Sequence, residues 1–555
     1  MLLFLGLVFI LKVVTCNVSS PPVVTLPLGT VEGYIGKTEQ GKDIYVFEGI
    51  PYAKPPVGDS RFEESVPPKP WKGIWKAKTI FKCLQYDHYT PPGPDKVSGD
   101  EDCLYVNVYS PTLDTTAKLD VLVYIHGGAF MFNHGGQTLP NIVLDRNIIF
   151  VNFNYRLGPL GFLSTEDEFV SGNNGIKDQI LALKWIKENI DRFGGNPNSI
   201  TISGMSAGGA SVHTHLITPR SRGLFSKAIS QSGVALNSWV FMEEPLNKTK
   251  TIALSVGCPI QNNKEMKKCL KSKPARQIAY GVKDLQPWLY NPFSPFGLVV
   301  DKWAKNPVFP EHPYQLIEKG LVEDVPWITS FTSAEGLYPG ADFYFDERLE
   351  FIDKNWNAIM PYILHYNDVI PVQQLDEVSS EIRKEYLQNE PVNKQTFSRL
   401  IEALSDRLFL ADIVLGTRLH AKSIKSPVYS YYFDYRGAHS KTENRIKSNK
   451  NIGVSHGDDT AYVFKTLDVL STENDKAMSK LMVDMFVSFM KTGKPNITSD
   501  WSPQSKKTSD PWMHLRIDSP DKLYMEKKEQ VGNQKFWESL PFKENQKLFN
   551  KRDEL

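Results

Sequence analysis

The chain has 555 residues, of which 41% are hydrophobic and 23% are charged, the balance of a globular protein large enough for a substantial core. Its formal net charge is +1, so the whole chain lacks the strong positive field that favours nucleic acid, and no nucleic-acid partner is expected. The sequence shows no internal repeat and no flexible linker. We therefore expect a single domain over residues 17–555.

Both ends of the chain have the pattern of targeting signals. Residues 1–16 form an apolar run that is too short to span a bilayer and is typical of a secretory signal peptide, although Lys12 interrupts the run and a buried N-terminal strand is the alternative. Residues 552–555 read Arg-Asp-Glu-Leu, one substitution from the signal that a receptor uses to return proteins to the endoplasmic reticulum. A solvated tail is the alternative there. We expect a protein of the secretory pathway, secreted or held in the endoplasmic reticulum lumen, without an integral membrane segment.

Cysteines and glycosylation sequons agree with an oxidising compartment. Removal of residues 1–16 leaves four cysteines, and close sequence neighbours favour the pairs Cys83–Cys103 and Cys258–Cys269 among the three pairings that four cysteines allow. Acceptor sequons for N-glycans begin at Asn17, Asn247 and Asn496.

Strand and helix patterns alternate along the first half of the chain. Residues 101–109 alternate in the manner of a half-buried strand. Residues 121–125 and 148–151 are uninterrupted apolar runs, as expected for strands that helices cover on both faces. Apolar residues then recur at helical spacing over residues 176–193, and Gly194 with Gly195 ends the helix.

The second half continues the alternation. Residues 325–331 and 428–433 have the pattern of sheet strands, and residues 341–425 between them are mostly helical in pattern. Alternating strands and helices predict an α/β fold with a large mixed, mostly parallel sheet, helices on both faces and helical insertions.

A candidate nucleophile lies in the centre of the chain. Residues 204–208 read Gly-Met-Ser-Ala-Gly, a G-x-S-x-G pattern between a predicted strand at 200–202 and a predicted helix from Ala210. Small residues around Ser206 allow a sharp strand-to-helix turn that exposes the hydroxyl group. A chance glycine-rich loop is the alternative for the pattern alone.

Backbone donors for an oxyanion are expected near this serine. His126-Gly127-Gly128 directly follows the strand at 121–125, which favours the N–H groups of Gly127 and Gly128, together with that of Ala207, as an oxyanion hole. A second His-Gly-Gly at residues 134–136 follows a loop instead. For each of the two His-Gly-Gly runs, the alternative is a flexible glycine loop without a functional role.

The general base has to be one of 11 histidines. In α/β folds that carry a G-x-S-x-G serine, the chain order is serine, acid, histidine. This order favours Glu335, at the end of a predicted strand, as the acid and His456, in a loop with Gly457, as the base. His439 is the second candidate for the base, whereas His213 and His215 are expected to be ordinary helix residues.

Many ordered motifs resemble the type-B carboxylesterases, the cholinesterase and carboxylesterase branch of the α/β hydrolases, from about Gly29 to Trp512. The Gly-Met-Ser-Ala-Gly elbow and residues 431–437 look most like insect carboxylesterases, including those described from venom. The further matching runs are residues 49–53, 101–105, 126–128, 154–158, 178–179, 193–197, 232–233, 335–336, 456–459 and 491–493.

The resemblance implies specific roles and contacts. It implies an α/β-hydrolase fold in which Ser206 is the nucleophile, His456 the base and Glu335 the acid, acting on a small-molecule ester with no cofactor and no metal. It also implies the disulfides Cys83–Cys103 and Cys258–Cys269. The remaining contacts that it implies are two structural ion pairs, Arg61 with Glu101 and Arg156 with Asp178.

Departures from the family pattern narrow the range of expected substrates. Cholinesterases carry Glu before the serine and juvenile-hormone esterases typically carry Gln, whereas this chain has Met205. The loop between Cys83 and Cys103 contains no tryptophan, so a choline-ester function loses the cation–π contact on which it depends. We expect hydrolysis of neutral carboxylic esters. A juvenile-hormone-esterase-like or lipase activity is the nearer alternative, and a non-catalytic, cholinesterase-like adhesion or binding protein is the alternative of another class.

Overall fold

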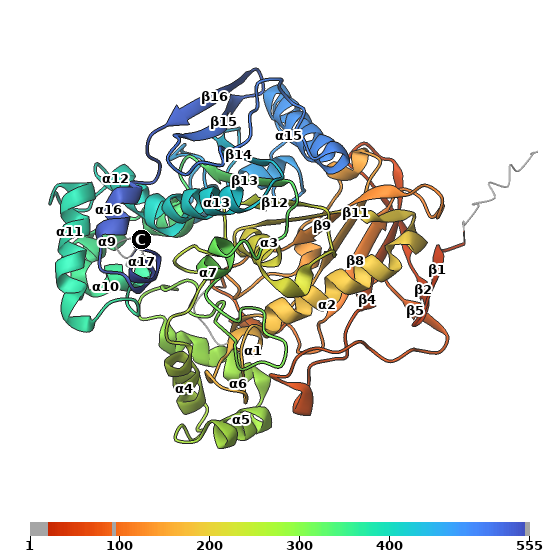
Figure 1. The fold of residues 1–555 in the computed structure, drawn as a ribbon, viewed down its shortest axis with the longest axis horizontal. Coiled ribbons are helices and arrows are strands. Elements are labelled where there is room, and N and C mark those ends of the chain that lie inside the picture. Colours follow the sequence, from red (N-terminus) through yellow and green to blue (C-terminus); the bar gives the residue numbers. More distant parts are fainter. Residues whose placement is uncertain (1–19, 91–95, 550–555) are drawn as a thin grey trace, which may run out of the picture.

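The computed structural model describes residues 20–90 and 96–549 (Figure 1). The predicted signal peptide, Asn17 and the Arg-Asp-Glu-Leu end lie outside these residues. The centre is an 11-stranded sheet with the order β16 (Lys522–Lys528), β15 (Trp512–Ser519), β14 (Val428–Phe433), β13 (Trp327–Thr332), β12 (Lys227–Gln231), β11 (Gly195–Met205), β9 (Leu119–Ile125), β10 (Ile149–Phe153), β8 (Tyr105–Ser110), β4 (Asp43–Pro51) and β3 (Tyr34–Lys37).

The sheet is mixed but mostly parallel. All neighbouring pairs from β15 to β10 are parallel. The pairs of β16 with β15, β10 with β8, β8 with β4 and β4 with β3 are antiparallel. Smaller sheets form from β1 (Val23–Leu26), β2 (Gly29–Glu32) and β5 (Ile74–Lys76), and from β6 (Gln85–Tyr86) and β7 (Val97–Ser98). The predicted sheet architecture is confirmed.

Helices cover both faces of the sheet. Alternate residues of β9 enter two separate core layers: Val121, Val123 and Ile125 pack on the side of α2 (Asn174–Asn189) and α3 (Ala207–Ile217). Leu122 and Tyr124 pack on the side of α15 (Glu473–Thr492). Because neither face of these strands meets water, their sequences are continuous apolar runs.

The strand predicted over residues 101–109 differs in two respects. It begins at Tyr105, and all its residues are buried, so the predicted half-buried strand is wrong. The reason is the position of β8 between β10 and β4 in the interior of the sheet, where both faces are covered. The polar Asn107 of β8 is satisfied by the neighbouring strands instead: its side chain donates to Asn152 of β10 over 2.7 Å and accepts from the N–H of Gly49 of β4 over 2.8 Å.

Helical segments surround the sheet, and the predicted helical region between β13 and β14 is confirmed. That region contains α8 (Leu337–Gly340), α9 (Asp346–Lys354), α10 (Trp356–Ile363), α11 (Leu375–Leu387), α12 (Phe397–Ser405) and α13 (Ala411–Ser423). Figure 1 shows α16 (Gln534–Ser539) and α17 (Lys543–Phe549) beside this group. The remaining helices are α1 (Gly158–Phe162), α4 (Pro245–Ser255), α5 (Asn263–Ser272), α6 (Ala275–Tyr280), α7 (Pro313–Glu318) and α14 (Glu443–Ile446).

Both predicted disulfides and both predicted ion pairs are present. The Arg61 guanidinium donates to both oxygens of Glu101 over 2.6 and 2.7 Å, and its third nitrogen donates to the carbonyl of Lys273 over 2.6 Å. Glu101 lies in the Cys83–Cys103 loop, and Lys273 directly follows α5, which carries Cys269. This arginine therefore joins the two disulfide-closed segments.

Candidate active site

Ser206 occupies the sharp turn between β11 and α3. Its backbone has φ 63° and ψ −125°, a conformation that costs a non-glycine residue on the order of 1–3 kcal/mol and is typical of a functional site. A Cβ atom on Gly204 would lie 2.4 Å from the backbone of Gly208, and one on Gly208 would lie 2.0 Å from the Ile125 carbonyl. The two glycines of the motif are therefore required by the close approach of strand and helix.

Gly127, Gly128 and Ala207 lie close to this serine. Gly127 and Gly128 line the same cavity as Ser206, and their N–H groups donate to no other residue in the described part of the chain. A Cβ atom on Gly127 would lie 2.4 Å from the Met205 carbonyl, so only glycine fits. Ala207 is the first residue of α3, where an N–H group has no partner within the helix.

Glu335 and His456 come together although 121 residues separate them. Ala334, after β13, forms a bridge with Ser455, and this contact aligns the two loops. The His456 Nδ1 and Glu335 Oε2 atoms lie 2.5 Å apart. Glu335 Oε1 accepts from the Ser232 hydroxyl over 2.6 Å and from the Thr332 N–H over 2.7 Å, which fixes the carboxylate.

The other nitrogen of His456, Nε2, is buried without a hydrogen-bond partner among the described residues. His456 and Ser206 line the same cavity, so this nitrogen is the one available to the serine side of the site. Tyr338 stacks on the imidazole with ring centroids 5.4 Å apart, and Phe409 packs against it at 4.6 Å. The ring is thus held by a carboxylate at one nitrogen and by aromatic faces around it.

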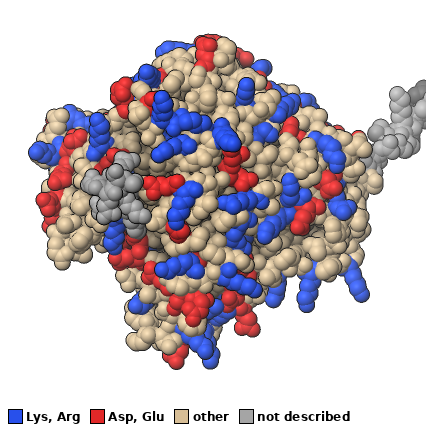
Figure 2. All heavy atoms as spheres, viewed as in Figure 1, with Lys and Arg blue, Asp and Glu red and all other residues tan. Residues whose placement is uncertain are grey.

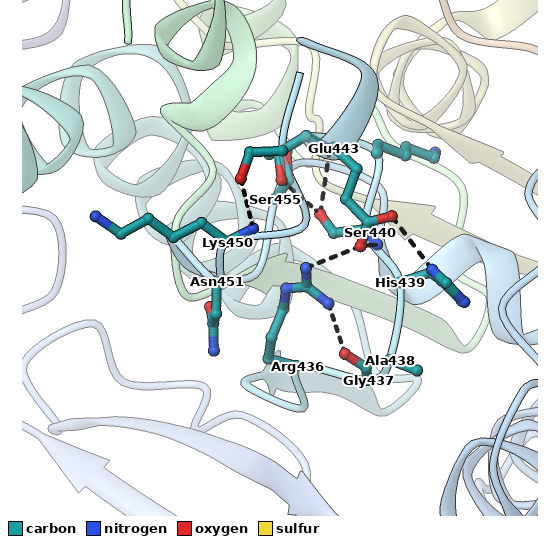
Figure 3. A network of polar contacts seen from close by, with 12 residues as sticks. Arg436, Gly437, Ala438, His439, Ser440, Glu443, Lys450, Asn451 and Ser455 are labelled. Carbon is teal, nitrogen blue, oxygen red and sulfur yellow. Dashed lines mark hydrogen bonds and ion pairs between the residues drawn. The ribbon is translucent and has the colours of Figure 1, made fainter. Parts of the chain in front are cut away.

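The other candidate histidines lie elsewhere. His439 pairs with Glu443 over 3.2 Å on a surface loop, where Figure 3 shows the two side chains facing each other, and it does not line the cavity. His213 is buried in α3, stacked on Trp327 at 4.6 Å. His215, also in α3, is hydrogen-bonded to Ser221 and Gln179, and burial lowers the pKa of His215 to about 3.

The cavity in front of Ser206 has a volume of about 380 Å³. No tryptophan is among the described residues that line it. Its charged lining residues are Lys441, Arg445 and Asp342. Its main apolar and aromatic lining residues are Tyr89, Tyr124, Phe132, Met205, Leu337 and Tyr338.

Several residues of the site were assigned no role from the sequence. Ser232 follows β12, and its hydroxyl donates to Glu335, 103 residues away. Its position at the end of the strand next to β11 is the signal that could have indicated its role in the site. The buried Asp459 accepts from the Tyr431 hydroxyl over 2.7 Å and from the Gln231 amide over 2.8 Å, and burial raises its pKa. Lys441 lies in a loop whose sequence gives no indication of a site.

The strained serine turn at the end of a parallel strand, with a carboxylate and a histidine in the loops that follow later strands, defines the class of α/β hydrolases. The chain belongs to the carboxylesterase family, whose model matches residues 20–537. Membership of this family makes the protein a serine carboxylic ester hydrolase that acts on small esters.

Insect esterases are among its most similar relatives. Venom carboxylesterase-6 of Apis mellifera is 41% identical over 532 residues, which cover 94% of this chain and 95% of the relative. Esterase E4 of Myzus persicae is 40% identical, with 91% of this chain and 92% of the relative covered. The crystal structure of juvenile hormone esterase from Manduca sexta, with OTFP covalently attached, matches with a TM-score of 0.80 at 26% identity, covering 94% of this chain and 99% of that one.

The surface carries both signs of charge. Figure 2 shows Lys and Arg side chains interspersed with Asp and Glu over one face of the molecule. Within residues 20–90 and 96–549, no helix has the length and apolar character needed to cross a membrane. The same residues contain no cluster of His, Cys, Asp or Glu suited to a metal ion.

Proposed function

We propose that the protein hydrolyses its ester substrate through an acyl intermediate on Ser206. His456 removes the hydroxyl proton, the Ser206 oxygen attacks the ester carbonyl carbon, and the alcohol leaves with a proton from the imidazolium. Water then repeats the sequence and releases the carboxylic acid. The observation that carries this proposal is the 2.5 Å contact of His456 with Glu335 at the edge of the cavity that Ser206 lines.

Glu335 has an orienting role in this mechanism. With its carboxylate held by Ser232 and Thr332, it fixes the imidazole tautomer and stabilises the imidazolium that forms. The N–H groups of Gly127, Gly128 and Ala207 stabilise the negative charge that develops on the carbonyl oxygen. Because these donors are part of the backbone and are positioned before substrate binds, they need no rearrangement during the reaction.

We propose that neutral aliphatic or aryl esters are much better substrates than choline esters of the same acyl group. Support comes from Met205, which places a thioether where a carboxylate would attract a cation, and from a cavity lining of described residues without tryptophan. Lys441 and Arg445 in the same lining also disfavour a quaternary ammonium group.

Retention of the serine, histidine and carboxylate in one geometry supports catalysis over a role in binding alone. Replacement of the nucleophile tests this. We expect Ser206→Ala to lower kcat for a soluble neutral ester by about four orders of magnitude or more without a change in folding. Ser199→Ala is a matched control on the same strand, because Ser199 lies far from the turn and bonds to Asp120. Near-normal hydrolysis by Ser206→Ala would contradict the mechanism.

We also infer that the protein enters the secretory pathway through residues 1–16 and is returned to the endoplasmic reticulum through a receptor for residues 552–555. The two disulfides support an oxidising compartment. The exposed side chains of Asn247 and Asn496 are accessible for N-glycans, and Asn17 completes the set of proposed acceptors.

A further inference from the structure

Two cations that line the active-site cavity have no ion-pair partner among the described residues. Lys441 and Arg445 both line the cavity, and no described carboxylate lies within ion-pair distance of either. The Arg445 guanidinium lies 3.2 Å from the centroid of the Tyr89 ring, a cation–π contact with an uncharged partner. The Lys441 ammonium makes no hydrogen bond to any described residue. Asp342, the carboxylate in the lining, accepts from the Tyr290 hydroxyl.

The Lys441 ammonium lies next to the reacting groups. A Cβ atom added to Gly457 would be 2.7 Å from Lys441 Nζ, 2.9 Å from Met205 Cε and 3.1 Å from Met205 Sδ. Gly457 follows His456, and Met205 precedes Ser206. The ammonium group therefore borders the part of the cavity where an ester bound to Ser206 would lie.

The loop that carries Lys441 is held firmly. The Lys441 N–H donates to Asp458 over 3.0 Å, and the Ser440 hydroxyl donates to the same carboxylate over 2.7 Å. Figure 3 shows the neighbouring network, in which Glu443 accepts from Arg436 and from the Ser440 N–H and also meets His439. Because the backbone of this loop is already held, the binding of a ligand group by the ammonium requires no ordering of the loop itself.

The buried carboxylates behind the loop do not engage this ammonium directly. Asp458 is bonded by a hydroxyl and by backbone N–H groups, Asp459 by Tyr431 and Gln231, and Glu335 by Ser232, Thr332 and His456. Burial lowers the pKa of Lys441, and the charges of the three carboxylates oppose this effect through space. Since each carboxylate already has its donors and Lys441 lines the cavity, the hydrogen-bond donors of the ammonium remain available to a bound group.

We propose that Lys441 binds a carboxylate group of the ester substrate, so that the cavity selects monoesters that carry a second, free carboxylate. This inference rests on the proposed function, because it assumes that the ester reacts at Ser206. A charge-assisted hydrogen bond in a partly dehydrated cavity corresponds to a preference of about 10-fold or more over an isosteric neutral ester.

Matched substrates and variants of Lys441 test the proposal. One pair places the charge on the acyl side, ethyl hydrogen adipate against ethyl hexanoate, and a second places it on the alcohol side, 3-(butyryloxy)propanoate against butyl butyrate. Acid release gives kcat/KM for each ester in the full-length protein. In Lys441→Met, the anionic-to-neutral ratio of kcat/KM should fall about 10-fold or more for at least one pair, chiefly through KM, and Lys441→Arg should restore part of it.

Lys450→Met is the matched control. It removes one positive charge from the segment that follows α14, but Lys450 is exposed, donates to the Tyr344 hydroxyl over 2.9 Å and does not line the cavity, so the ratio should not change. An unchanged ratio in Lys441→Met for both pairs would overturn the proposal, as would parent protein that hydrolyses the neutral esters and neither anionic one. Failure of the parent protein to hydrolyse any of the four esters, together with no reaction at Ser206, would instead overturn the proposed function.

Discussion

Met205 and Lys441 are two side chains that set the charge near Ser206. A carboxylate at position 205 would favour the imidazolium form of His456 and would lie next to the Lys441 ammonium. The thioether that is present gives neither effect, so the local charge comes from the lysine. This arrangement accounts for the proposed rejection of cationic esters without any contact specific to choline.

Met205→Glu is expected to move the acidic limb of kcat/KM to higher pH by about half a unit or more. The direction follows because the added anion favours the protonated imidazole, and His456 has to lose its proton to act as the base. The profile is measured with one neutral ester for the parent, Met205→Glu and the uncharged control Met205→Gln, which should leave the limb in place. An unmoved limb in folded Met205→Glu would show that residue 205 does not act on the histidine.

The residues of the site differ in how well the sequence predicts them. Ser206, Gly127 and Gly128 belong to local motifs whose backbone requirements are visible in a few neighbouring residues. The assignment of Glu335 and His456 depended on the resemblance to carboxylesterases, because their contact joins loops that are 121 residues apart in the sequence. Ser232 belongs to a run that matches the family but was assigned no role. Lys441 was missed because a single Lys in a loop has no pattern that separates it from a surface residue.

At the scale of elements, buried strands follow most directly from the sequence. The predicted strand at residues 428–433 matches β14, and the apolar runs match β9 and β10. Strands that are buried on both faces have uninterrupted apolar sequences, which makes them easy to recognise. The error at β8 arose because alternation predicts one covered face, whereas its polar residues are paired inside the sheet.

A π-helical turn over Asp406–Leu410, between α12 and α13, supports the site from the side of the helical insertion. Its Phe409 packs against His456. The Leu408 carbonyl accepts from the Trp239 indole over 2.7 Å and from the Asn237 amide over 3.0 Å. The widened turn thereby exposes a carbonyl to a neighbouring loop, a use that matches the usual occurrence of such turns at functional sites.

Asp406 in this turn makes stability depend on pH. Burial raises the pKa of Asp406 to about 7, and the Tyr386 hydroxyl, which donates over 2.9 Å, opposes this effect. Because the folded-state pKa exceeds the unfolded value, the folded protein holds the proton more strongly, and its stability falls as pH rises from about 4 to 7.

Asp406→Asn should remove this dependence. Between pH 5 and pH 7.5 the free energy of unfolding of the parent should fall relative to that of Asp406→Asn by roughly 2 kcal/mol. Urea denaturation at the two pH values measures the difference, and Asp521→Asn, at an exposed carboxylate, is the control. Parallel changes in the parent and Asp406→Asn would show that Asp406 is ionised throughout this range.

The molecule as a whole combines one large sheet with two disulfides, which are typical of proteins in oxidising compartments. Arg61 connects the Cys83–Cys103 loop with the segment after α5, so the covalent closures and a buried ion pair act on one region. Composition and charge indicated only that the chain is globular. The alternation of strands and helices predicted the α/β class. The order of strands in the sheet required the structure, because no local sequence pattern specifies which strands are neighbours.

Deletion of residues 552–555 is expected to increase secretion from expressing cells, because a retrieval receptor would no longer return the protein. The medium-to-cell ratio of the protein is compared with that of a variant in which the same four residues are kept and Ala is added after Leu555, which should also be secreted more. Equal secretion of all three would identify the end of the chain as an ordinary tail.

The most direct test of the account is covalent labelling of the parent protein with an organophosphate ester, followed by peptide mapping. A serine activated by His456 and backed by the oxyanion donors should be labelled with a stoichiometry of about one per chain at Ser206, with parallel loss of ester hydrolysis. Ser206→Ala should not be labelled. Correctly folded parent protein that takes up no label at Ser206, or that keeps its esterase activity when Ser206 is fully labelled, would contradict the central claim.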